Sequence, residues 1–93
     1  MRIISGVHKG KKIQAPKNLP IRPTTDRAKE SLFNILENRY IFENKKILDL
    51  FSGSGNISFE FSSRANVNIT AVDNNINCIK FIRKLNKELN YNI

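Results

Sequence analysis

The sequence predicts an α/β fold built around one strand, one glycine loop and one helix, and three observations carry this prediction. The apolar run Ile47–Phe51 is typical of a strand, and the loop behind it contains Gly53 and Gly55, which can take positive φ or let a ligand approach the backbone. A helical pattern begins at Asn56, directly after the loop. Eighteen residues after Gly55, a second apolar run ends in Asp73, where nucleotide-binding α/β units place a carboxylate for ribose hydroxyls.

Residues 26–38 are predicted to form an amphipathic helix ahead of the first strand. Thr24, Thr25 and Asp26 supply residues that commonly cap a helix N-terminus. This helix should pack on the main domain through apolar residues at helical spacing, widened by Phe33: Ala28, Leu32, Ile35 and Leu36.

The main sheet is predicted to contain strands over residues 44–51 and 67–72. The composition of the first strand is that of a fully buried strand, apart from Asp49. A carboxylate in such a run is costly unless it is paired or used, so Asp49 is a candidate functional residue. Tyr91–Ile93 are expected to begin a third strand.

A second helix is predicted over residues 56–64. Ile57 and Phe61 lie four residues apart and should therefore point together at the sheet. Glu60 is expected at the surface or near the helix dipole, and Arg64 is expected as a C-terminal charge of the helix.

The first 24 residues are predicted to form a basic β-hairpin and a Pro-containing connector, ahead of a main domain over residues 25–93. Residues 2–6 and 11–15 have the composition of short strands around a glycine-bounded turn, and the prolines that follow favour an extended connector. A lone hairpin is unstable. It must therefore dock on the main domain or become ordered on a partner.

Basic residues outnumber acidic ones by sixteen to eight, and the excess is concentrated in the first 25 residues, which contain no acid. Such an arm indicates a polyanionic partner, with nucleic acid favoured over a membrane because the arm has no long apolar face. A merely solvated basic surface is the alternative. The candidate phosphate contacts are Arg2, Lys9, Lys11, Lys12, Lys17, Arg22 and Arg27.

The single cysteine and the single histidine argue against a metal site. Cys78 can form no intrachain disulfide and no cysteine zinc site, which fits a reducing cytosol. It lies on the inner stripe of a third predicted helix over residues 75–89, so core packing is expected. His8 has no second ligand. The chain has no apolar run long enough to span a bilayer, and its N-terminus lacks the apolar core of a signal peptide. A cytoplasmic protein is therefore expected.

The strand, loop and acid series predicts an adenosyl cofactor, and the neighbouring residues favour S-adenosylmethionine. Dinucleotide sites need Gly or Ala, for close packing of helix and strand, at the position where this chain has Ser58. Asp49 would also repel a pyrophosphate. S-adenosylmethionine is cationic at sulfur and at its ammonium group, which suits a carboxylate at the end of the first strand. The loop amides are expected to serve its carboxylate.

Three segments resemble known sequence motifs. Asp49–Gly55 is similar to motif I of class I methyltransferases. Arg22–Arg27, with Glu30 and Leu32–Leu36 behind it, resembles the signature of the bacterial 16S rRNA guanine-N2 methyltransferase family, and Met1–Gly10 is similar to the hairpin of that family. The resemblance implies the N-terminal half of a class I, Rossmann-like fold. The cofactor-binding residues that it implies are Thr24, Thr25, Asp49, Phe51, Gly53, Gly55, Asp73 and Asn74.

The catalytic motif of that family, Asn or Asp followed by Pro-Pro and an aromatic residue, has no counterpart in this chain, whose prolines are Pro16, Pro20 and Pro23. We therefore expect the motif beyond Ile93 and no catalytic residue within the chain. The resemblance implies a complete enzyme that methylates guanine N2 of 16S rRNA, free or in the assembling small ribosomal subunit. The 93 residues alone are expected to be inactive.

Two other functions are open on the sequence alone. One is a non-catalytic RNA-binding module with the same fold, and the other is a nicotinamide-dependent oxidoreductase, which Ser58 and Asp49 disfavour. A monomer is expected for the full-length enzyme. The fragment is expected to be destabilised or to self-associate, because its first strand would have an unpaired edge and an uncovered face.

Overall fold

The computed structural model describes residues 1–21 and 24–93 and confirms the predicted α/β class, with a small parallel sheet. The elements in chain order are α1 (Asp26–Arg39), β1 (Lys46–Leu50), α2 (Asn56–Arg64), β2 (Asn68–Val72) and α3 (Ile76–Leu89). β1 and β2 pair in parallel, with Leu50 opposite Val72. Both strands therefore end at the same edge of the sheet.

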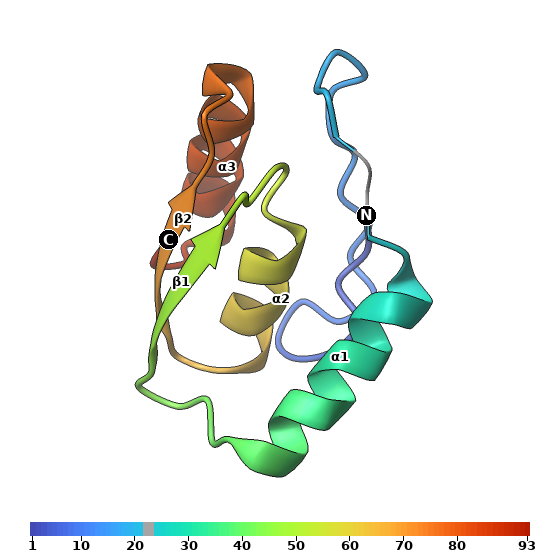
Figure 1. The fold of residues 1–93 in the computed structure, drawn as a ribbon, viewed down its shortest axis with the longest axis vertical. Helices are drawn as coiled ribbons and strands as arrows, with labels where there is room; N and C mark the ends of the chain where they lie inside the picture. Colours follow the sequence, from blue (N-terminus) through green and yellow to red (C-terminus); the bar gives the residue numbers. More distant parts are fainter. Residues whose placement is uncertain (22–23) are drawn as a thin grey trace.

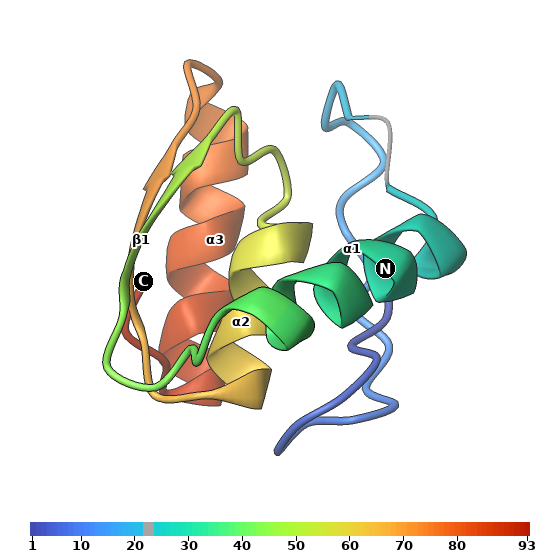
Figure 2. The ribbon, with the colours of Figure 1, turned by 60° about the horizontal axis from the view of Figure 1, so that its bottom comes forward.

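The helices form layers on one side of the two strands. Figures 1 and 2 show α2 and α3 against one face of the sheet, with α1 and the N-terminal segment beyond α2. The main hydrophobic cluster of the described residues lies between these layers and includes Ile3, Ile13, Phe59, Ile82 and Leu85. Cys78 is buried, as its helical position predicts. The N-terminal segment thus supplies part of the main core.

The N-terminal hairpin docks on α2, which is the first of the two alternatives that the sequence left open. The Val7 amide donates to the Ser63 carbonyl at 2.8 Å, and the Ser63 hydroxyl donates to the Ser5 carbonyl at 2.7 Å. The predicted pair of strands is reduced to one antiparallel bridge, between Arg2 and Lys12. The amides of residues 4 and 5 bond to the Glu60 carboxylate of α2 rather than to the other half of the hairpin.

The buried face of α1 differs from the predicted stripe. Phe33 is completely buried, as predicted, but Leu32 is 40% exposed and Ile35 is 55% exposed, and the unexpected Lys29 is completely buried. Phe33 packs edge-on against Phe61, with ring centroids 4.6 Å apart. Phe61 was expected to face the sheet, and it faces α1 instead because an aromatic cluster forms there.

β1 is open on one face, so the prediction of a fully buried first strand is wrong. Leu48 is 62% exposed and Leu50 is 56% exposed, because no helix of the described residues covers that side of the sheet (Figure 2). The third strand predicted to begin at Tyr91–Ile93 is not formed. The Asn92 carbonyl nevertheless accepts a hydrogen bond from the Ile69 amide at 3.0 Å, so this segment runs beside β2.

Candidate functional site

A cavity of about 370 Å³ opens where β1 and β2 end and where α2 begins. Asp49 reaches it from β1, and Asp73 reaches it from the residue that follows β2, because parallel strands end at a common edge. Six of the predicted cofactor residues line this cavity: Thr24, Asp49, Phe51, Gly53, Asp73 and Asn74.

The two remaining candidates lie outside the lining. Thr25 caps α1, where its hydroxyl accepts a hydrogen bond from the Ala28 amide at 3.1 Å. Gly55 caps α2 with φ of +83°, and a Cβ atom there would lie 2.8 Å from Phe59 and 3.0 Å from Ile82. Glycine is required at this position by both the backbone angle and the close packing.

Asp73 ties the glycine loop to the end of β2. One carboxylate oxygen accepts from the Gly53 amide at 2.9 Å, and the other accepts from the Asn75 amide at 2.8 Å. The Gly55 amide is also occupied, by the Ser52 carbonyl at 2.9 Å. Two loop amides expected to serve a cofactor carboxylate are therefore bonded within the protein.

Asp49 lines the cavity and accepts a hydrogen bond from a buried hydroxyl. The Ser58 side chain is completely buried and donates to the Asp49 carboxylate at 2.6 Å. Burial raises the pKa of Asp49, the hydrogen bonds from Ser58 oppose that rise, and the nearby charge of Asp73 adds to it. The pKa of Asp49 is thus raised overall, and its negative charge is held against a desolvation cost.

The charge of the cavity favours a cationic ligand. Asp49 and Asp73 line it, and no lysine, arginine or histidine does among the residues that the structure describes. A phosphorylated ligand would meet two carboxylates and no described cation, whereas a cation would be attracted to both.

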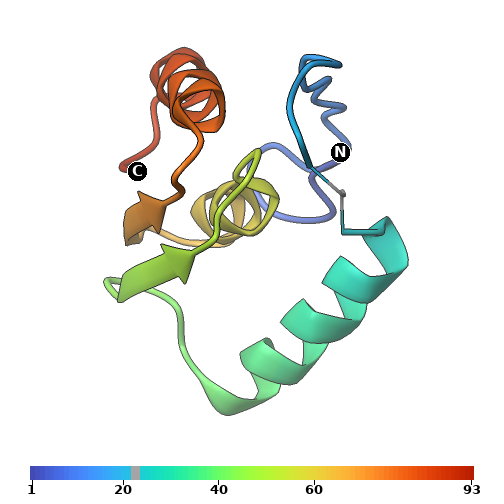
Figure 3. The same ribbon diagram turned by 45° about the horizontal axis from the view of Figure 1, so that its top comes forward.

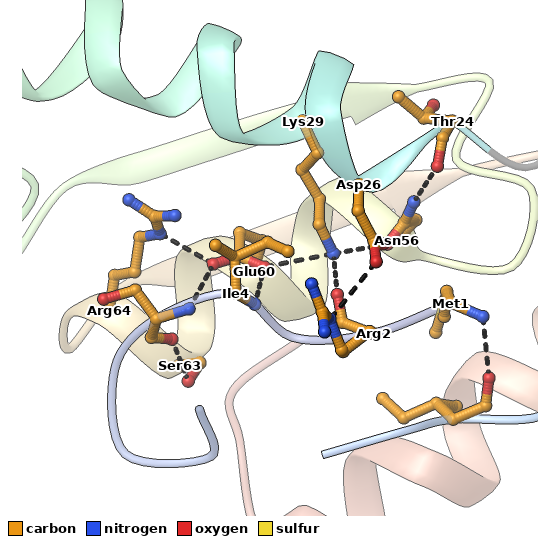
Figure 4. A network of polar contacts seen from close by, with 12 residues as sticks. Met1, Arg2, Ile4, Thr24, Asp26, Lys29, Asn56, Glu60, Ser63 and Arg64 are labelled. Atoms are coloured by element: carbon orange, nitrogen blue, oxygen red, sulfur yellow. Dashed lines mark hydrogen bonds and ion pairs between the residues drawn. The ribbon is translucent and has the colours of Figure 1, made fainter. Parts of the chain in front are cut away.

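A buried ionic network behind the cavity was missed by sequence reasoning (Figure 4). Lys29 Nζ lies 3.0 Å from a Glu60 carboxylate oxygen and donates to the Asn56 side-chain oxygen at 2.8 Å and to the Arg2 carbonyl. The Asn56 amide group donates to the Thr24 carbonyl at 3.2 Å. This network joins α1, α2 and the segment that reaches the cavity.

Glu60 is buried rather than at the surface, and local spacing could have signalled this. Arg64 lies one turn later on α2 and donates to Glu60 at 2.7 Å. Lys29 stands one turn before Phe33, so the two share a face of α1. The helical spacing of Glu60 and Arg64 on α2, and of Lys29 and Phe33 on α1, was the signal in the sequence that these charges could be buried.

The predicted phosphate contacts are distributed over two grooves and the turn. Arg2, Lys12 and Lys17 line a groove of about 730 Å³, where Arg2 pairs with Asp26 at 3.2 Å. Lys11 and Lys12 line a second groove beside α3. Two further predicted phosphate contacts, Lys9 and Arg27, are exposed and line neither groove. Arg22 lies outside the described residues.

The described part of the chain shows neither a membrane-spanning helix nor clustered metal ligands. None of its helices has the length and apolar character needed to cross a membrane. Across residues 1–21 and 24–93, no three His, Cys, Asp or Glu side chains gather as a metal site would require.

Known relatives match nearly the whole chain. Ribosomal RNA small subunit methyltransferase D of Buchnera aphidicola from Acyrthosiphon pisum is 42% identical over 93 residues, which cover 98% of this chain and 47% of that protein. The Escherichia coli protein of the same name is 38% identical over 73 residues, covering 78% and 36% respectively. The chain spans less than half the length of the curated relatives that it matches.

Solved structures agree with the fold. An Escherichia coli chain described as "Putative methyltransferase yhhF" superposes with a TM-score of 0.79 at 31% identity, covering 97% of this chain and 47% of that one. The partial Rossmann-like fold predicted from the sequence is thereby confirmed. Residues 1–93 match the family described as "Conserved hypothetical protein 95", so the chain belongs to that family and is related to these rRNA methyltransferases, as its motifs predicted.

Proposed function

We propose that the chain forms the cofactor-binding part of an S-adenosylmethionine-dependent methyltransferase that acts on guanine N2 of 16S rRNA. The observation that carries this proposal is the cavity lined by Asp49, Asp73 and the glycine loop. The relatives named as ribosomal RNA methyltransferases support the reaction class and the rRNA substrate.

The residues of the cavity suit S-adenosylmethionine. Asp49 lies where a carboxylate would hold the cationic methionine end, and Asp73 and Asn74 lie together at the end of β2, where they would hold the adenosine. Each Asp73 oxygen accepts one amide hydrogen bond and keeps a lone pair for a ribose hydroxyl. Thr24 would close the cavity from the connector.

When bound, the cofactor supplies an activated methyl group. The protein then has to position the reactants, since methyl transfer is a direct displacement that needs no covalent nucleophile. Asp73 contributes to this positioning by accepting a hydrogen bond from the Gly53 amide, which fixes the glycine loop. Asn56, itself bonded to Lys29, donates to the Thr24 carbonyl and so fixes the segment that reaches the cavity.

A dinucleotide cofactor fits less well. Ser58 occupies the position where helix and strand need Gly or Ala for the closest packing, and its hydroxyl is committed to Asp49 at 2.6 Å. The pyrophosphate would also lie near two carboxylates. Thermal unfolding with each ligand distinguishes the two classes: S-adenosylmethionine should raise the midpoint and NAD should not. A larger rise with NAD would overturn the cofactor assignment.

The substrate assignment is tested on cellular rRNA. We expect disruption of the gene to remove N2-methylguanosine from one position of 16S rRNA, and we expect the intact gene to restore it, but not the gene carrying Asp73→Asn. Unchanged 16S rRNA nucleosides after disruption would contradict the proposal. Retained RNA binding in that case would favour the non-catalytic module.

A further inference from the structure

We propose that a groove between the N-terminal hairpin and α3 binds the RNA backbone, with α3 supplying half of its phosphate contacts. The ligand class rests on the proposed function, and the inference adds where the RNA runs. Four lysines line this groove, two from the hairpin and two from α3: Lys11, Lys12, Lys80 and Lys84.

The groove brings together segments that are distant in the sequence. Its volume is about 480 Å³, and residues from the hairpin and connector form one wall while α3 forms the other. Figure 3 shows the N-terminal segment and α3 flanking α2 on the same side of the molecule. The basic arm considered alone is therefore only half of the basic surface.

The spacing along α3 places its lysines on one face. Residues 77, 80, 84 and 88 follow one another at intervals of three or four and all line the groove. The core face of the same helix carries Cys78, Ile82 and Leu85. Lys80 and Lys84 are exposed, so a ligand in the groove can reach both.

The charge of the groove is not neutralised within the described part of the protein. Glu88 is the acid that lines it, against four lysines, and the ion pairs of residues 1–21 and 24–93 involve other side chains. Lys80 and Lys84 are like charges four residues apart, an arrangement that disfavours the helix. A row of phosphates would relieve this repulsion and release counterions.

The position of the groove connects it to the cofactor cavity. Asn75 caps the N-terminus of α3 and lines the cavity together with Cys78 of the first turn, while Asn77 lies between them in sequence and lines the groove. RNA held along the groove would therefore run toward the site where the cofactor is proposed to bind.

Other polyanions fit the groove less well. Of the apolar residues that line it, Ile13, Leu19 and Leu85 are each less than one-tenth exposed. Phe81 is half-buried against the core, and Pro16 is exposed but small, so a lipid surface would find little to insert against. Gln14, Asn18 and Asn77 supply neutral donors between the lysines, which suit phosphate and ribose oxygens.

The experiment compares two double variants of α3 that lose the same charge. Lys80→Gln/Lys84→Gln removes both positive charges that α3 contributes to the groove. Arg83→Gln/Lys87→Gln removes two exposed positive charges of the same helix that do not line the groove. The dissociation constant for a labelled single-stranded RNA is measured by fluorescence anisotropy over a range of salt concentrations. Each lost contact should flatten the log–log salt slope by about 0.7.

We expect the slope to flatten by about 1.4 in the Lys80→Gln/Lys84→Gln variant and to stay unchanged in the Arg83→Gln/Lys87→Gln variant. A Lys80→Arg/Lys84→Arg variant should keep the wild-type slope, because it keeps both positive charges. Equal losses in the two glutamine variants would overturn the groove assignment. Equally tight binding of poly-glutamate or of anionic vesicles would overturn RNA as its ligand.

Cofactor binding by the wild type and the α3 variants tests the proposed function independently of RNA binding. The midpoint shift caused by S-adenosylmethionine should be the same in all of them, because neither lysine lines the cofactor cavity. Wild-type chain that shifts with S-adenosylmethionine but binds no RNA would refute the groove and leave the cofactor site standing. A missing shift with normal groove behaviour would refute the cofactor site alone.

Discussion

Lys29 and Glu60 are completely buried, and each charge is compensated by contacts from several segments. Glu60 accepts hydrogen bonds from the amides of Ile4 at 2.9 Å and Ser5 at 3.1 Å and from Arg64 at 2.7 Å. Burial opposes ionisation of Glu60, but the bonds from Ile4, Arg64 and Lys29 outweigh it, so the pKa of Glu60 is lowered. The carboxylate thus stays ionised and anchors the N-terminal segment.

Replacing Lys29 tests the energetic weight of this network. Lys29→Met should lower the free energy of unfolding by about 3–5 kcal/mol, because it leaves a buried carboxylate without one of its two cationic partners. The measurement is urea unfolding, with Lys45→Met as an exposed control. Adding Glu60→Gln to Lys29→Met should restore part of the loss. A loss no larger than that of the control would show that the pair is not a determinant of stability.

Asp49 should reduce stability at neutral pH. Its pKa is raised on folding, so the folded state binds its proton more tightly than the unfolded state, and its penalty grows as the pH rises through the folded pKa. Asp49→Asn should therefore raise the free energy of unfolding at pH 7, and the gain should shrink toward pH 3 as the wild-type carboxyl protonates.

The measurement for Asp49 is the difference between wild type and Asp49→Asn in urea unfolding across this pH range. Other titrating groups are shared by both proteins and cancel in the difference. A variant that is less stable than wild type at pH 7 would contradict the assignment of a desolvated carboxylate.

Some site residues could be predicted from sequence and others could not. Asp49, Gly53 and Asp73 follow from two strands that end at one edge, which is a property of the chain order. Thr24 and Thr25 are adjacent and chemically alike, so only the structure distinguishes the cavity residue from the helix cap.

At the scale of elements, the docking of the hairpin on α2 depends on Gly6. Its φ is +93°, and a Cβ atom there would lie 1.9 Å from the Ser63 carbonyl oxygen. Gly10 has a similar φ of +84°, yet a Cβ atom there would meet nothing within 4 Å. A substitution at Gly10 therefore adds backbone strain alone, whereas one at Gly6 adds the same strain and a clash with α2.

Gly6→Ala should detach the hairpin, whereas Gly10→Ala should add only the strain of a left-handed residue, about 1–2 kcal/mol. Hydrogen exchange at the amides of Ile4, Ser5 and Val7 measures this docking, since all three bond to α2. We expect faster exchange in the Gly6 variant and near wild-type protection in the Gly10 variant. Equal exchange in the two variants would argue against docking through this contact.

The orientation of α1 shows where sequence reasoning fails for an element. Phe33 is buried as predicted, but the apolar stripe of Leu32 and Ile35 is exposed, and α1 buries Lys29 beside Phe33 instead. The partners of these side chains, Glu60 and Phe61, lie in α2. Local periodicity shows which charged and aromatic residues share a face of α1, but it carries no information about partners about thirty residues away. The choice between this face and the apolar stripe therefore could not be made from the sequence.

At the scale of the whole molecule, one face of the sheet carries exposed apolar side chains. Leu48, Leu50 and Val72 are 62%, 56% and 43% exposed, and Phe51 beside them is 91% exposed. β1 pairs with β2 on one edge, and no other strand of the described residues pairs with it. An open edge next to an apolar face favours association between chains.

The 93-residue chain should therefore self-associate in a concentration-dependent manner, as the sequence also led us to expect. Sedimentation velocity of wild type is compared with Leu48→Lys/Leu50→Lys, which charges the exposed face. We predict a larger apparent mass for wild type at high concentration and a monomer for the variant. A compact wild-type monomer at all concentrations would refute the prediction.

The central claim is that the acidic cavity at the ends of β1 and β2 binds S-adenosylmethionine, and calorimetric titration of the 93-residue chain tests it most directly. Asp73→Asn removes one charge within the cavity, and Glu30→Gln removes one from an exposed position of α1 as the matched control. We predict one-site binding to wild type and to Glu30→Gln, and binding at least tenfold weaker to Asp73→Asn. Absence of binding to wild type, or equal affinity of all three proteins, would contradict the account.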